Sequence, residues 1–375
     1  MKERIGGKHV HQEFLFEGLK ELGVNVQRLY FPGFSFFTLA STRVVSFVIR
    51  SYAVSWRVRH MIDFFHSGPF ADFDIVHSHD VVSAYGVNAT NLVLTVHGYF
   101  AREVFDYSDY LDRDKDRRLF EWLLEMEKRA VQKAKKMIAV DSRIKQYLIG
   151  ELGVSQEKVI VLYNAIDDKT FAPISEVEKT ELRKKLKIPE KAFTVLLARR
   201  FVPKNGVLYA AEAFSKLKSD EYFFVIAGGG KLKGDMLKLL KENRNFVLYE
   251  NLSHDKIADY YKACDMVLVP SVTSTDVEEA TSLAMLEGMA CGKIVVCTKV
   301  GGMKEVIKHM ENGILIEQKD VQAIVDAIEY VKGNYKQLEH VRRKAREHVV
   351  QNHGYLNYAK KVVEIYQEVL NDNRV

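Results

Sequence analysis

The chain has 375 residues, of which 47% are hydrophobic and 28% are charged, and its formal net charge is +5. This is an ordinary composition for a folded, water-soluble protein, and the length allows two domains with a core in each. Cys264, Cys291 and Cys297 lie in or beside apolar runs, which predicts buried thiols in a reducing compartment and excludes a disulfide framework.

The chain starts with a short charged segment that leads into Ile5-Gly6-Gly7-Lys8. An amphipathic helix is predicted over residues 9–22, where Gly23 would end it, and a strand is predicted over residues 24–30. A pair of glycines before a helix is by itself only a weak signal, since most such loops are turns.

A basic and aromatic segment follows at residues 41–65 and is compatible with a helix. Arg43, Arg50 and Arg57 recur every seven residues among apolar side chains. One interpretation is a solvated arginine stripe on a helix that packs on a sheet, and the other is an interfacial helix that meets anionic lipid. No membrane-spanning helix is expected at residues 29–49, because a proline and an arginine interrupt this apolar window.

Apolar runs at residues 74–79 and 92–97 predict two strands, which end at His79 and His97. Ligands of open parallel sheets bind beyond the carboxyl ends of the strands, so both histidines are candidates for a site. A lone histidine is more often structural, which remains the alternative. A charged helix is predicted over residues 111–135, and further strands over residues 137–141 and 159–163.

The second half opens with a charged helix over residues 176–186 and a strand over residues 193–198. Arg199, Arg200 and Lys204 follow this strand. Three cations in a strand-to-helix turn suit a diphosphate, and a basic surface loop is the alternative.

The next predicted strand, at residues 222–227, ends at Gly228-Gly229-Gly230. The full dinucleotide-binding fingerprint with its later acid is absent, so a nicotinamide cofactor is not expected. Another strand is predicted over residues 246–252, and helices are predicted from Val321 and from Tyr355.

The chain is organised around residues 264–302, where two β-branched runs flank a polar loop and a short helix. The runs, at residues 266–269 and 294–297, predict buried parallel strands. The helix is expected to begin near Thr281 and Ser282, two residue types that favour N-cap positions. The start of such a helix offers N–H groups and a positive dipole to a phosphate.

Glu278 and Glu279 lie in this loop, and Glu287 lies on the helix. A carboxylate before the helix could reach a sugar beside the phosphate, and one further along could accept hydrogen bonds from a vicinal diol such as ribose. Each acid alone is more simply explained as a solvated group near a helix start.

The order of these residues resembles a known motif. Glu279 and Glu287 are separated by seven residues and followed by Gly-Met-Ala-Cys-Gly, a strand and Val-Gly-Gly. This is similar to the Glu-(seven residues)-Glu motif of retaining glycosyltransferases of group 1 with the GT-B fold, a family that includes glycogen synthases and phosphatidylinositol mannosyltransferases. The resemblance extends to His97-Gly98, to residues 164–167 (Asn-Ala-Ile-Asp) and to Phe171-Ala172-Pro173.

The resemblance implies an α/β chain with two doubly wound Rossmann-like domains that face a cleft. Residues 1–168 would form the acceptor-side domain, residues 169–354 the nucleotide-sugar domain, and residues 355–375 a helix that returns to the first domain. In the family, a strand precedes the Gly-Gly loop, whereas here only five residues precede Gly6. We therefore expect that the functional protein starts upstream of Met1 or that the strand has been lost, that residues 1–5 form no full central strand, and that the two glycines are poorly placed for donor or acceptor.

The resemblance also assigns roles to the site. His97, Glu279 and Arg200 would be catalytic, with Glu279 orienting the donor sugar. Asn205 occupies the usual lysine position, and Lys204 stands one place earlier. The donor-binding residues implied by the family are Gly6, Gly7, Arg200, Lys204, Leu252, Glu279, Thr281, Ser282, Leu283 and Glu287, with Glu287 on the ribose and Leu252 near the base.

The implied activity is metal-independent transfer of a sugar, with retention, from a UDP- or GDP-sugar to a glycan or a lipid-linked acceptor. No cofactor, metal or nucleic acid is expected. The protein would be cytoplasmic, with peripheral membrane contact through residues 41–65. Two alternatives remain: a protein that binds nucleotide sugar without turnover, and a sugar-nucleotide epimerase.

Overall fold

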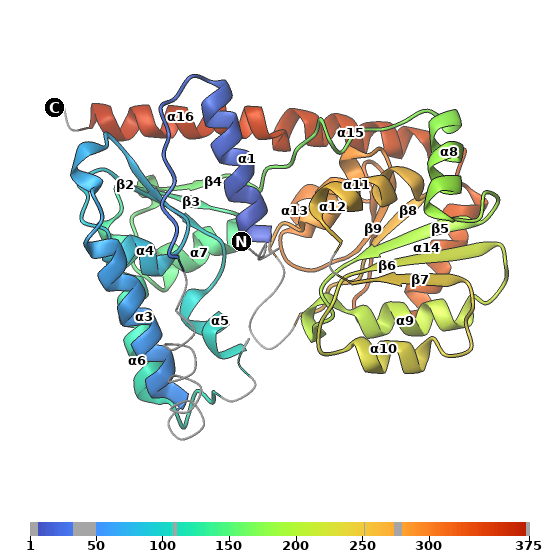
Figure 1. Ribbon diagram of the computed structural model, residues 1–375, viewed down its shortest axis with the longest axis horizontal. Coiled ribbons are helices and arrows are strands. Elements are labelled where there is room, and N and C mark those ends of the chain that lie inside the picture. Colours follow the sequence, from blue (N-terminus) through green and yellow to red (C-terminus); the bar gives the residue numbers. More distant parts are fainter. Residues whose placement is uncertain are drawn as a thin grey trace. The chain divides into compact units, whose positions relative to one another are not determined.

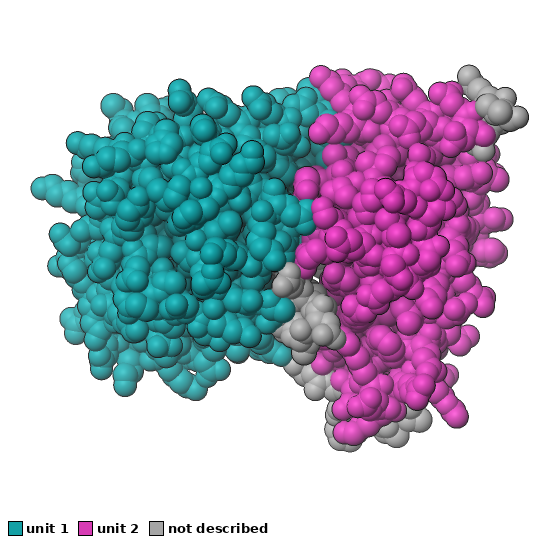
Figure 2. Space-filling model, turned by 180° about the vertical axis from the view of Figure 1, so that it is seen from behind, with its two compact units in different colours: residues 1–18, 164–358 teal, residues 19–163, 359–375 magenta. Residues whose placement is uncertain are grey.

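The computed structural model describes residues 7–32, 50–106, 108, 111–250, 252–273 and 280–372. The chain divides into two compact units, which Figure 2 colours separately. Unit 1 comprises residues 1–18 and 164–358, and unit 2 comprises residues 19–163 and 359–375. Helices α1 (Gly7–Glu21) and α16 (Tyr355–Asn371) each begin in unit 1 and end in unit 2.

Unit 2 contains a parallel sheet whose described strands follow the order β1-β2-β3-β4 (Figure 1). The interior strand at residues 92–96 is buried along its whole length, as its apolar sequence predicts. The strands are β1 (Val76–Ser78), β2 (Leu92–Val96), β3 (Lys136–Ala139) and β4 (Val159–Val161). The helices are α3 (Arg50–His66), α4 (Val81–Gly86), α5 (Phe100–Asp106), α6 (Arg117–Lys133) and α7 (Ser142–Gly150), with 3-10 turns η1 (Phe70–Asp72) and η2 (Gln156–Lys158).

Unit 1 contains a parallel sheet in the order β10-β9-β8-β5-β6-β7. The strands are β5 (Phe193–Ala198), β6 (Tyr222–Ala227), β7 (Phe246–Tyr249), β8 (Met266–Val269), β9 (Ile294–Thr298) and β10 (Ile314–Ile316). The helices are α8 (Glu176–Leu186), α9 (Val207–Lys216), α10 (Lys233–Leu239), α11 (His254–Ala263), α12 (Leu283–Ala290), α13 (Met303–Val306), α14 (Val321–Gly333) and α15 (Glu339–His353), with a 3-10 turn η3 (Pro203–Asn205).

The strand order of unit 1 creates a topological switch point between β5 and β8. The chain starts at β5, moves outward to β6 and β7, and then returns to the other side of β5 to form β8, β9 and β10. Helices α9, α10 and α14 cover one face, and α8, α11, α12 and α15 cover the other (Figure 1). In such sheets, ligands bind beyond the carboxyl ends of the strands where the order reverses.

Several predicted elements of unit 1 have the bounds that the sequence indicates. Helix α8 and strands β5, β6 and β8 begin and end at the predicted residues. In unit 2, the helix expected from residue 111 begins only at Arg117. The side chain of Asp112 explains the delay, because it accepts hydrogen bonds from the backbone N–H groups of Asp114 and Lys115 and forms a turn ahead of the helix.

The strand predicted over residues 24–30 is wrong. Residues 24–32 form neither helix nor strand, and residues 27–30 are exposed. The alternating pattern of this segment suits a strand, but it pairs with none of the described strands, and a strand requires a ladder partner. Helix α1 ends as expected at Gly23, whose φ of +77° places it in the left-handed region.

Some predictions concern residues outside the described part of the chain. These are the expected absence of a strand at residues 1–5, the placement of Gly6, the role of Arg43, and the loop acids Glu278 and Glu279. Gly7 is described and is the first residue of α1. Within the described ranges, none of the helices combines the length and the apolar character that crossing a membrane requires.

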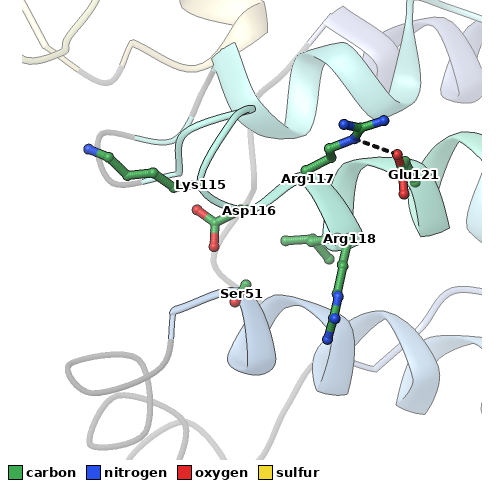
Figure 3. A pocket seen from close by; sticks show the side chains of 7 residues that line it. Ser51, Lys115, Asp116, Arg117, Arg118 and Glu121 are labelled. Carbon is green, nitrogen blue, oxygen red and sulfur yellow. Dashed lines mark hydrogen bonds and ion pairs between the residues drawn. The ribbon is translucent and has the colours of Figure 1, made fainter.

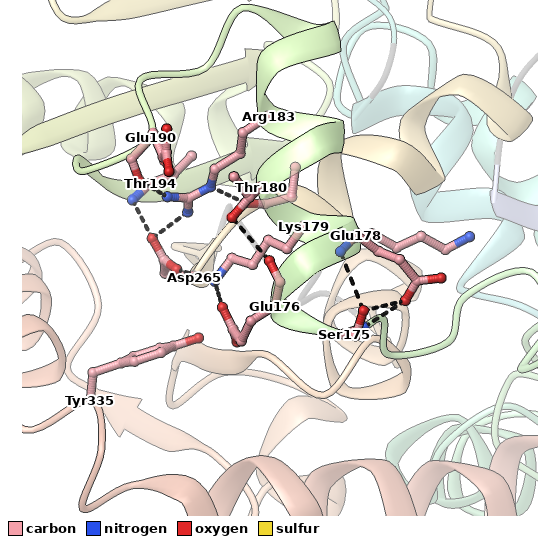
Figure 4. A network of polar contacts seen from close by, with 12 residues as sticks. Ser175, Glu176, Glu178, Lys179, Thr180, Arg183, Glu190, Thr194, Asp265 and Tyr335 are labelled. Atoms are coloured by element: carbon pink, nitrogen blue, oxygen red, sulfur yellow. Dashed lines mark hydrogen bonds and ion pairs between the residues drawn. The ribbon is translucent and has the colours of Figure 1, made fainter.

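A buried ion cluster ties α8 to the start of β8 (Figure 4). Asp265, which is 6% exposed, accepts from Lys179 Nζ at 2.6 Å, Arg183 Nη2 at 2.6 Å and the backbone N–H of Thr194 at 2.7 Å. Burial alone would raise the pKa of the Asp265 carboxyl, but the two cations hold it below its usual range. The cluster therefore fixes the strand that leads to the switch point.

Glycines let the loops after β5, β6 and β8 approach each other at backbone distance. A Cβ added at Gly206, which has a φ of +63°, would lie 1.7 Å from the carbonyl oxygen of Pro270. One added at Gly228 would lie 1.9 Å from the carbonyl oxygen of Arg199. Gly228 is thus explained by close packing, without a dinucleotide.

Replacing Asp265 by Ala should lower the free energy of unfolding by ~3–5 kcal/mol, because Lys179 and Arg183 would stay buried without their shared carboxylate. Urea unfolding followed by circular dichroism measures this. The matched control is Asp235→Ala, which removes an exposed pair with Lys238 on α10 and should cost less than ~1 kcal/mol. Equal losses in the two variants would contradict the structural role of the cluster.

Gly206→Ala should destabilise the protein by clearly more than Gly153→Ala. Both glycines have a left-handed φ, +63° and +69°, but a Cβ at Gly153 meets nothing within 4 Å. The control therefore carries only the backbone cost of ~1–2 kcal/mol, whereas Gly206→Ala adds the clash with Pro270. Thermal and urea unfolding of the two variants decide the point, and similar midpoints would show that the β5 and β8 loops are not packed as described.

Candidate active site

The carboxyl edge of β5, β6 and β8 in unit 1 is held together by backbone hydrogen bonds between its loops. The N–H of Phe201 donates to the carbonyl of Gly229 at 2.8 Å, and the N–H of Val272 donates to the carbonyl of Lys204 at 2.8 Å. The loop after β5 is therefore joined to the loops on both sides of it.

Arg199 is the charged centre of this edge. The residue is 8% exposed, and its guanidinium donates to Ser282 Oγ, Asn205 Oδ1 and Ser271 Oγ, each at 2.8 Å. These three acceptors come from the start of α12, from η3 and from the loop after β8. A single buried cation thus connects three segments at the switch point.

Helix α12 is drawn close to the sheet by Gly288, where a Cβ would lie 2.9 Å from side-chain carbons of both Val267 and Val295. Ser282 is the N-cap residue, but its hydroxyl accepts from Arg199 and makes no capping bond to the helix. The carbonyl of Thr281 accepts from Asn164 Nδ2 at 3.0 Å. The first N–H groups of a helix lack intrahelical partners, so this terminus is suited to an anion.

Glu287 lies on α12, five positions after its N-cap, and is 7% exposed. Tyr261 on α11 is fully buried, and its hydroxyl interacts electrostatically with this carboxylate. Burial, together with the charge of Glu287, raises the pKa of Tyr261 well above its usual value, so its hydroxyl stays protonated. The positive charge of Arg199 also affects Tyr261, since it lowers the pKa of that hydroxyl. Glu287, Tyr261 and Arg199 therefore lie in the same part of unit 1.

The other donor-site candidates lie in more accessible positions. Arg200 is exposed, Lys204 is half-buried on η3, and Leu252 is half-buried between β7 and α11. Leu283 is the first residue of α12. Of the two adjacent arginines, the one that points inward is Arg199, whereas the sequence favours Arg200 for contact with the diphosphate.

In unit 2, His97 follows β2 and stands beside His79, which follows β1. Their Nε2 and Nδ1 atoms are 3.5 Å apart. His77 stacks on His79 with ring centroids 4.3 Å apart, and its two ring nitrogens lie 2.7 Å from Tyr366 Oη and Thr95 Oγ1. The two histidines expected at strand ends are therefore neighbours, and a row of three imidazoles lines this edge.

Sequence reasoning missed Tyr261 and Asn164 as parts of the site, and weighed Arg199 only as one of three loop cations. No local pattern marks Tyr261, since it occupies an apolar position of an ordinary amphipathic helix. The signal for Arg199 was its place directly after β5, but its acceptors Ser271 and Ser282 lie more than 70 residues later in the chain.

Two family models match the chain. The model of Glycosyl transferases group 1 matches residues 178–348, and the model of Glycosyltransferase Family 4 matches residues 5–170. Together they span both halves of the chain.

Individual proteins that are similar to this chain are also glycosyltransferases. An uncharacterized glycosyltransferase of Methanocaldococcus jannaschii is 27% identical over 79% of this chain and 75% of its own length. The UDP-Gal:alpha-D-GlcNAc-diphosphoundecaprenol alpha-1,3-galactosyltransferase of Escherichia coli is 25% identical over 80% of this chain and 76% of its own.

Among solved structures, sucrose-phosphate synthase from Thermosynechococcus elongatus has the same fold, with a TM-score of 0.74 and 17% identity over 99% of this chain and 95% of that protein. The predicted GT-B fold, with two parallel-sheet α/β domains, is thereby confirmed. From its two family matches and this fold, the chain belongs to the group 1 glycosyltransferases.

Proposed function

We propose that this glycosyltransferase moves a hexose from a UDP- or GDP-sugar to a glycan or lipid-linked acceptor, with retention at the anomeric carbon and without a metal. The observation that carries the proposal is the carboxyl edge of unit 1, where buried Arg199 holds the start of α12 beside buried Glu287. The relative from Escherichia coli is named for a UDP-sugar donor and a diphosphoundecaprenol acceptor, which supports the same substrate classes.

In this proposal the donor diphosphate binds at the start of α12. The N–H groups of Ser282 and Leu283 and the backbone of Thr281 meet the phosphates, and the positive end of the helix stabilises their charge. Arg200 and Lys204, on the loop after β5, supply further positive charge as the leaving diphosphate forms. Arg199 contributes indirectly, because its hydrogen bond to Ser282 fixes the start of α12.

The remaining roles follow from the resemblance. Glu287 accepts hydrogen bonds from the ribose diol, Leu252 lies near the base, and Glu279 orients the donor sugar. His97, from unit 2, acts beside the transferred sugar. The leaving phosphate itself helps to deprotonate the acceptor on the face that it leaves, so the anomeric configuration is kept.

Product analysis tests the reaction. A purified enzyme incubated with a panel of UDP- and GDP-hexoses should release sugar slowly to water, and NMR of the first product should show the anomeric configuration of the donor. Inversion would refute the retaining mechanism. Binding without release would favour the nucleotide-sugar-binding alternative, and conversion of the sugar with the diphosphate kept in place would favour an epimerase.

Glu287→Ala should weaken the binding of the free nucleoside diphosphate by about 2 kcal/mol, or about thirtyfold in Kd, because a charged hydrogen bond to ribose is lost. Calorimetric titration measures the change. Glu287→Gln keeps the side-chain volume beside Tyr261 and guards against a folding defect. The control Glu329→Ala alters an exposed residue on α14, and an unchanged Kd for both Glu287 variants would remove the proposed role.

We also propose that unit 2 contacts anionic membranes, as a protein with a lipid-linked acceptor would require. Helix α3 packs through buried Ala53 and Val58, and it exposes Tyr52 (57%) and Arg59. Arg59 stacks over the ring of Trp122, with 5.3 Å between its guanidinium carbon and the ring centroid.

A cationic pocket of about 570 Å³ lies next to this helix (Figure 3). Lys115, Arg117 and Arg118 line it opposite Ser51 of α3, together with Asp116, Leu119 and Glu121. Arg117 is paired with Glu121 at 2.7 Å and Lys115 with Asp112 at 3.8 Å. With three cations against Asp116 and Glu121, the lining residues carry a net charge of +1.

Changing Lys115, Arg117 and Arg118 to Gln should weaken binding to phosphatidylserine vesicles about tenfold or more, since each cation near such a surface contributes ~1 kcal/mol. Co-sedimentation with anionic and neutral vesicles measures this. The control changes Lys336, Arg343 and Lys344 of unit 1 to Gln, with the same change in net charge. Binding that is no stronger to anionic than to neutral vesicles would end the membrane proposal.

A further inference from the structure

Glu127 is a carboxylic acid enclosed in the interior of unit 2. It lies in the middle of α6 and is 0% exposed. Its Oε1 accepts from the N–H of Phe100 and its Oε2 from the N–H of Ala101, both at 3.1 Å. These are the first two residues of α5, which directly follow His97-Gly98-Tyr99. The Glu127 carboxylate therefore holds the backbone in place three residues after His97.

The rest of this turn is anchored to α7. The ring of Tyr99 packs edge-on against the ring of Tyr147 at 4.8 Å, and Arg102 lies over Tyr147 at 5.3 Å from its centroid. Arg102 is also paired with Glu151 at 2.5 Å. Tyr147 therefore contacts both Tyr99 and Arg102 of this turn, and its hydroxyl lowers the pKa of the Glu127 carboxyl.

The titratable groups that act on the Glu127 carboxyl come from α7 and α5. The hydroxyl of Tyr147 on α7 favours the charged carboxylate, and the charge of Glu103 on α5 opposes it. The charges of Arg102 and Glu151 act on the hydroxyl of Tyr147, where Arg102 lowers its pKa and Glu151 raises it. On α4, Tyr85 interacts with Arg129 of α6.

Burial is the largest of these effects, and it raises the pKa of Glu127 to about 7, even though the N–H of Ala101, the hydroxyl of Tyr147 and the N–H of Phe100 all lower it. The carboxyl therefore changes charge near neutral pH. An ionised carboxylate accepts through both oxygens, and hydrogen bonds to it are about twice as strong as neutral ones. The protonated acid offers one full acceptor and loosens the other bond.

We propose that Glu127 is a positioning residue that fixes the turn carrying His97, and that this turn becomes more ordered when the carboxyl is ionised. The inference rests on the proposed function only in its last step, the effect of His97 on transfer. Its first step, control of the turn by Glu127, concerns unit 2 alone and can be measured without substrate.

A purely structural role makes a different prediction for pH. The folded pKa of Glu127 lies above that of an exposed glutamic acid, so between pH 4.5 and 7 the native state holds a proton that the unfolded state has lost. Glu127 therefore makes the free energy of unfolding fall as pH rises through this window. The order of the turn should change in the opposite direction, which separates positioning from global stability.

The first experiment is hydrogen–deuterium exchange of the full chain, read on peptides that cover residues 97–106 and corrected for intrinsic exchange between pH 6 and 8.5. Wild type should gain at least fivefold protection across pH 7, and Glu127→Gln should not. Glu125→Gln is the matched control, because Glu125 lies on the same helix but is exposed and paired with Arg129. It should behave as wild type, and a Glu127→Gln profile equal to wild type overturns the inference.

If Glu127→Gln does not fold, Tyr147→Phe replaces it in the exchange experiment. Its lost hydroxyl stabilised the charged carboxylate, so the midpoint of the protection profile should move to higher pH. An unmoved midpoint would also overturn the inference.

Activity is the second readout. Glu127→Gln should lower kcat at least tenfold and flatten its rise across pH 7, with an unchanged KM for the donor, which binds in unit 1. A raised KM with unchanged kcat would contradict positioning of His97. If wild type transfers sugar from no donor, the proposed function fails, whereas the exchange result still decides the role of Glu127.

Discussion

The structure of the candidate site depends on one buried guanidinium. Arg199 takes its positive charge out of water, which is costly unless the charge is well supplied with hydrogen-bond acceptors. Three such acceptors lie at 2.8 Å, and they belong to three different loops. Moving any of these loops would leave part of a buried charge unsatisfied, so the geometry of the edge is stabilised by an electrostatic requirement and not only by packing.

That requirement operates within tight backbone contacts. Gly206 and Gly228 permit the loops after β5, β6 and β8 to meet without side chains between them, and Gly288 brings α12 against β8 and β9. The contacts of α12 with the sheet thus place the start of this helix at the switch point. Its N–H groups therefore need not move when an anion binds. Preorganised donors of this kind stabilise a developing negative charge without the cost of reorganisation.

The sequence predicts the elements of unit 1 better than their contacts. Strands β5, β6 and β8 are short apolar runs that end before a charged residue, a glycine and a proline respectively, and their bounds follow from that pattern. The segment at residues 24–30 has an alternating pattern that also suits a strand, yet it forms no strand, because strand formation needs a partner that the local sequence does not specify. Helix α6 begins late for a local reason, the side chain of Asp112, which competes for backbone N–H groups.

The site was predictable to a similar degree. The helix start at Ser282 and the place of Glu287 on that helix follow from the sequence pattern, but the inward position of Arg199 and the electrostatic interaction of Tyr261 with Glu287 depend on residues far apart in sequence. Two adjacent arginines after a strand are equivalent in a pattern, and only the positions of Ser271 and Ser282 decide which is buried. The role of Glu127 is even harder to predict from the sequence, since there it is one acid among many on a charged helix.

We expect the donor diphosphate to bind at the edge of unit 1, at the switch point. A crystal structure of the protein with UDP or GDP bound tests this most directly. Phosphate oxygens should lie within hydrogen-bond distance of the N–H groups of Ser282 and Leu283, and the ribose should lie on Glu287. A diphosphate bound instead at the edge of unit 2 that carries His77, His79 and His97 would contradict it.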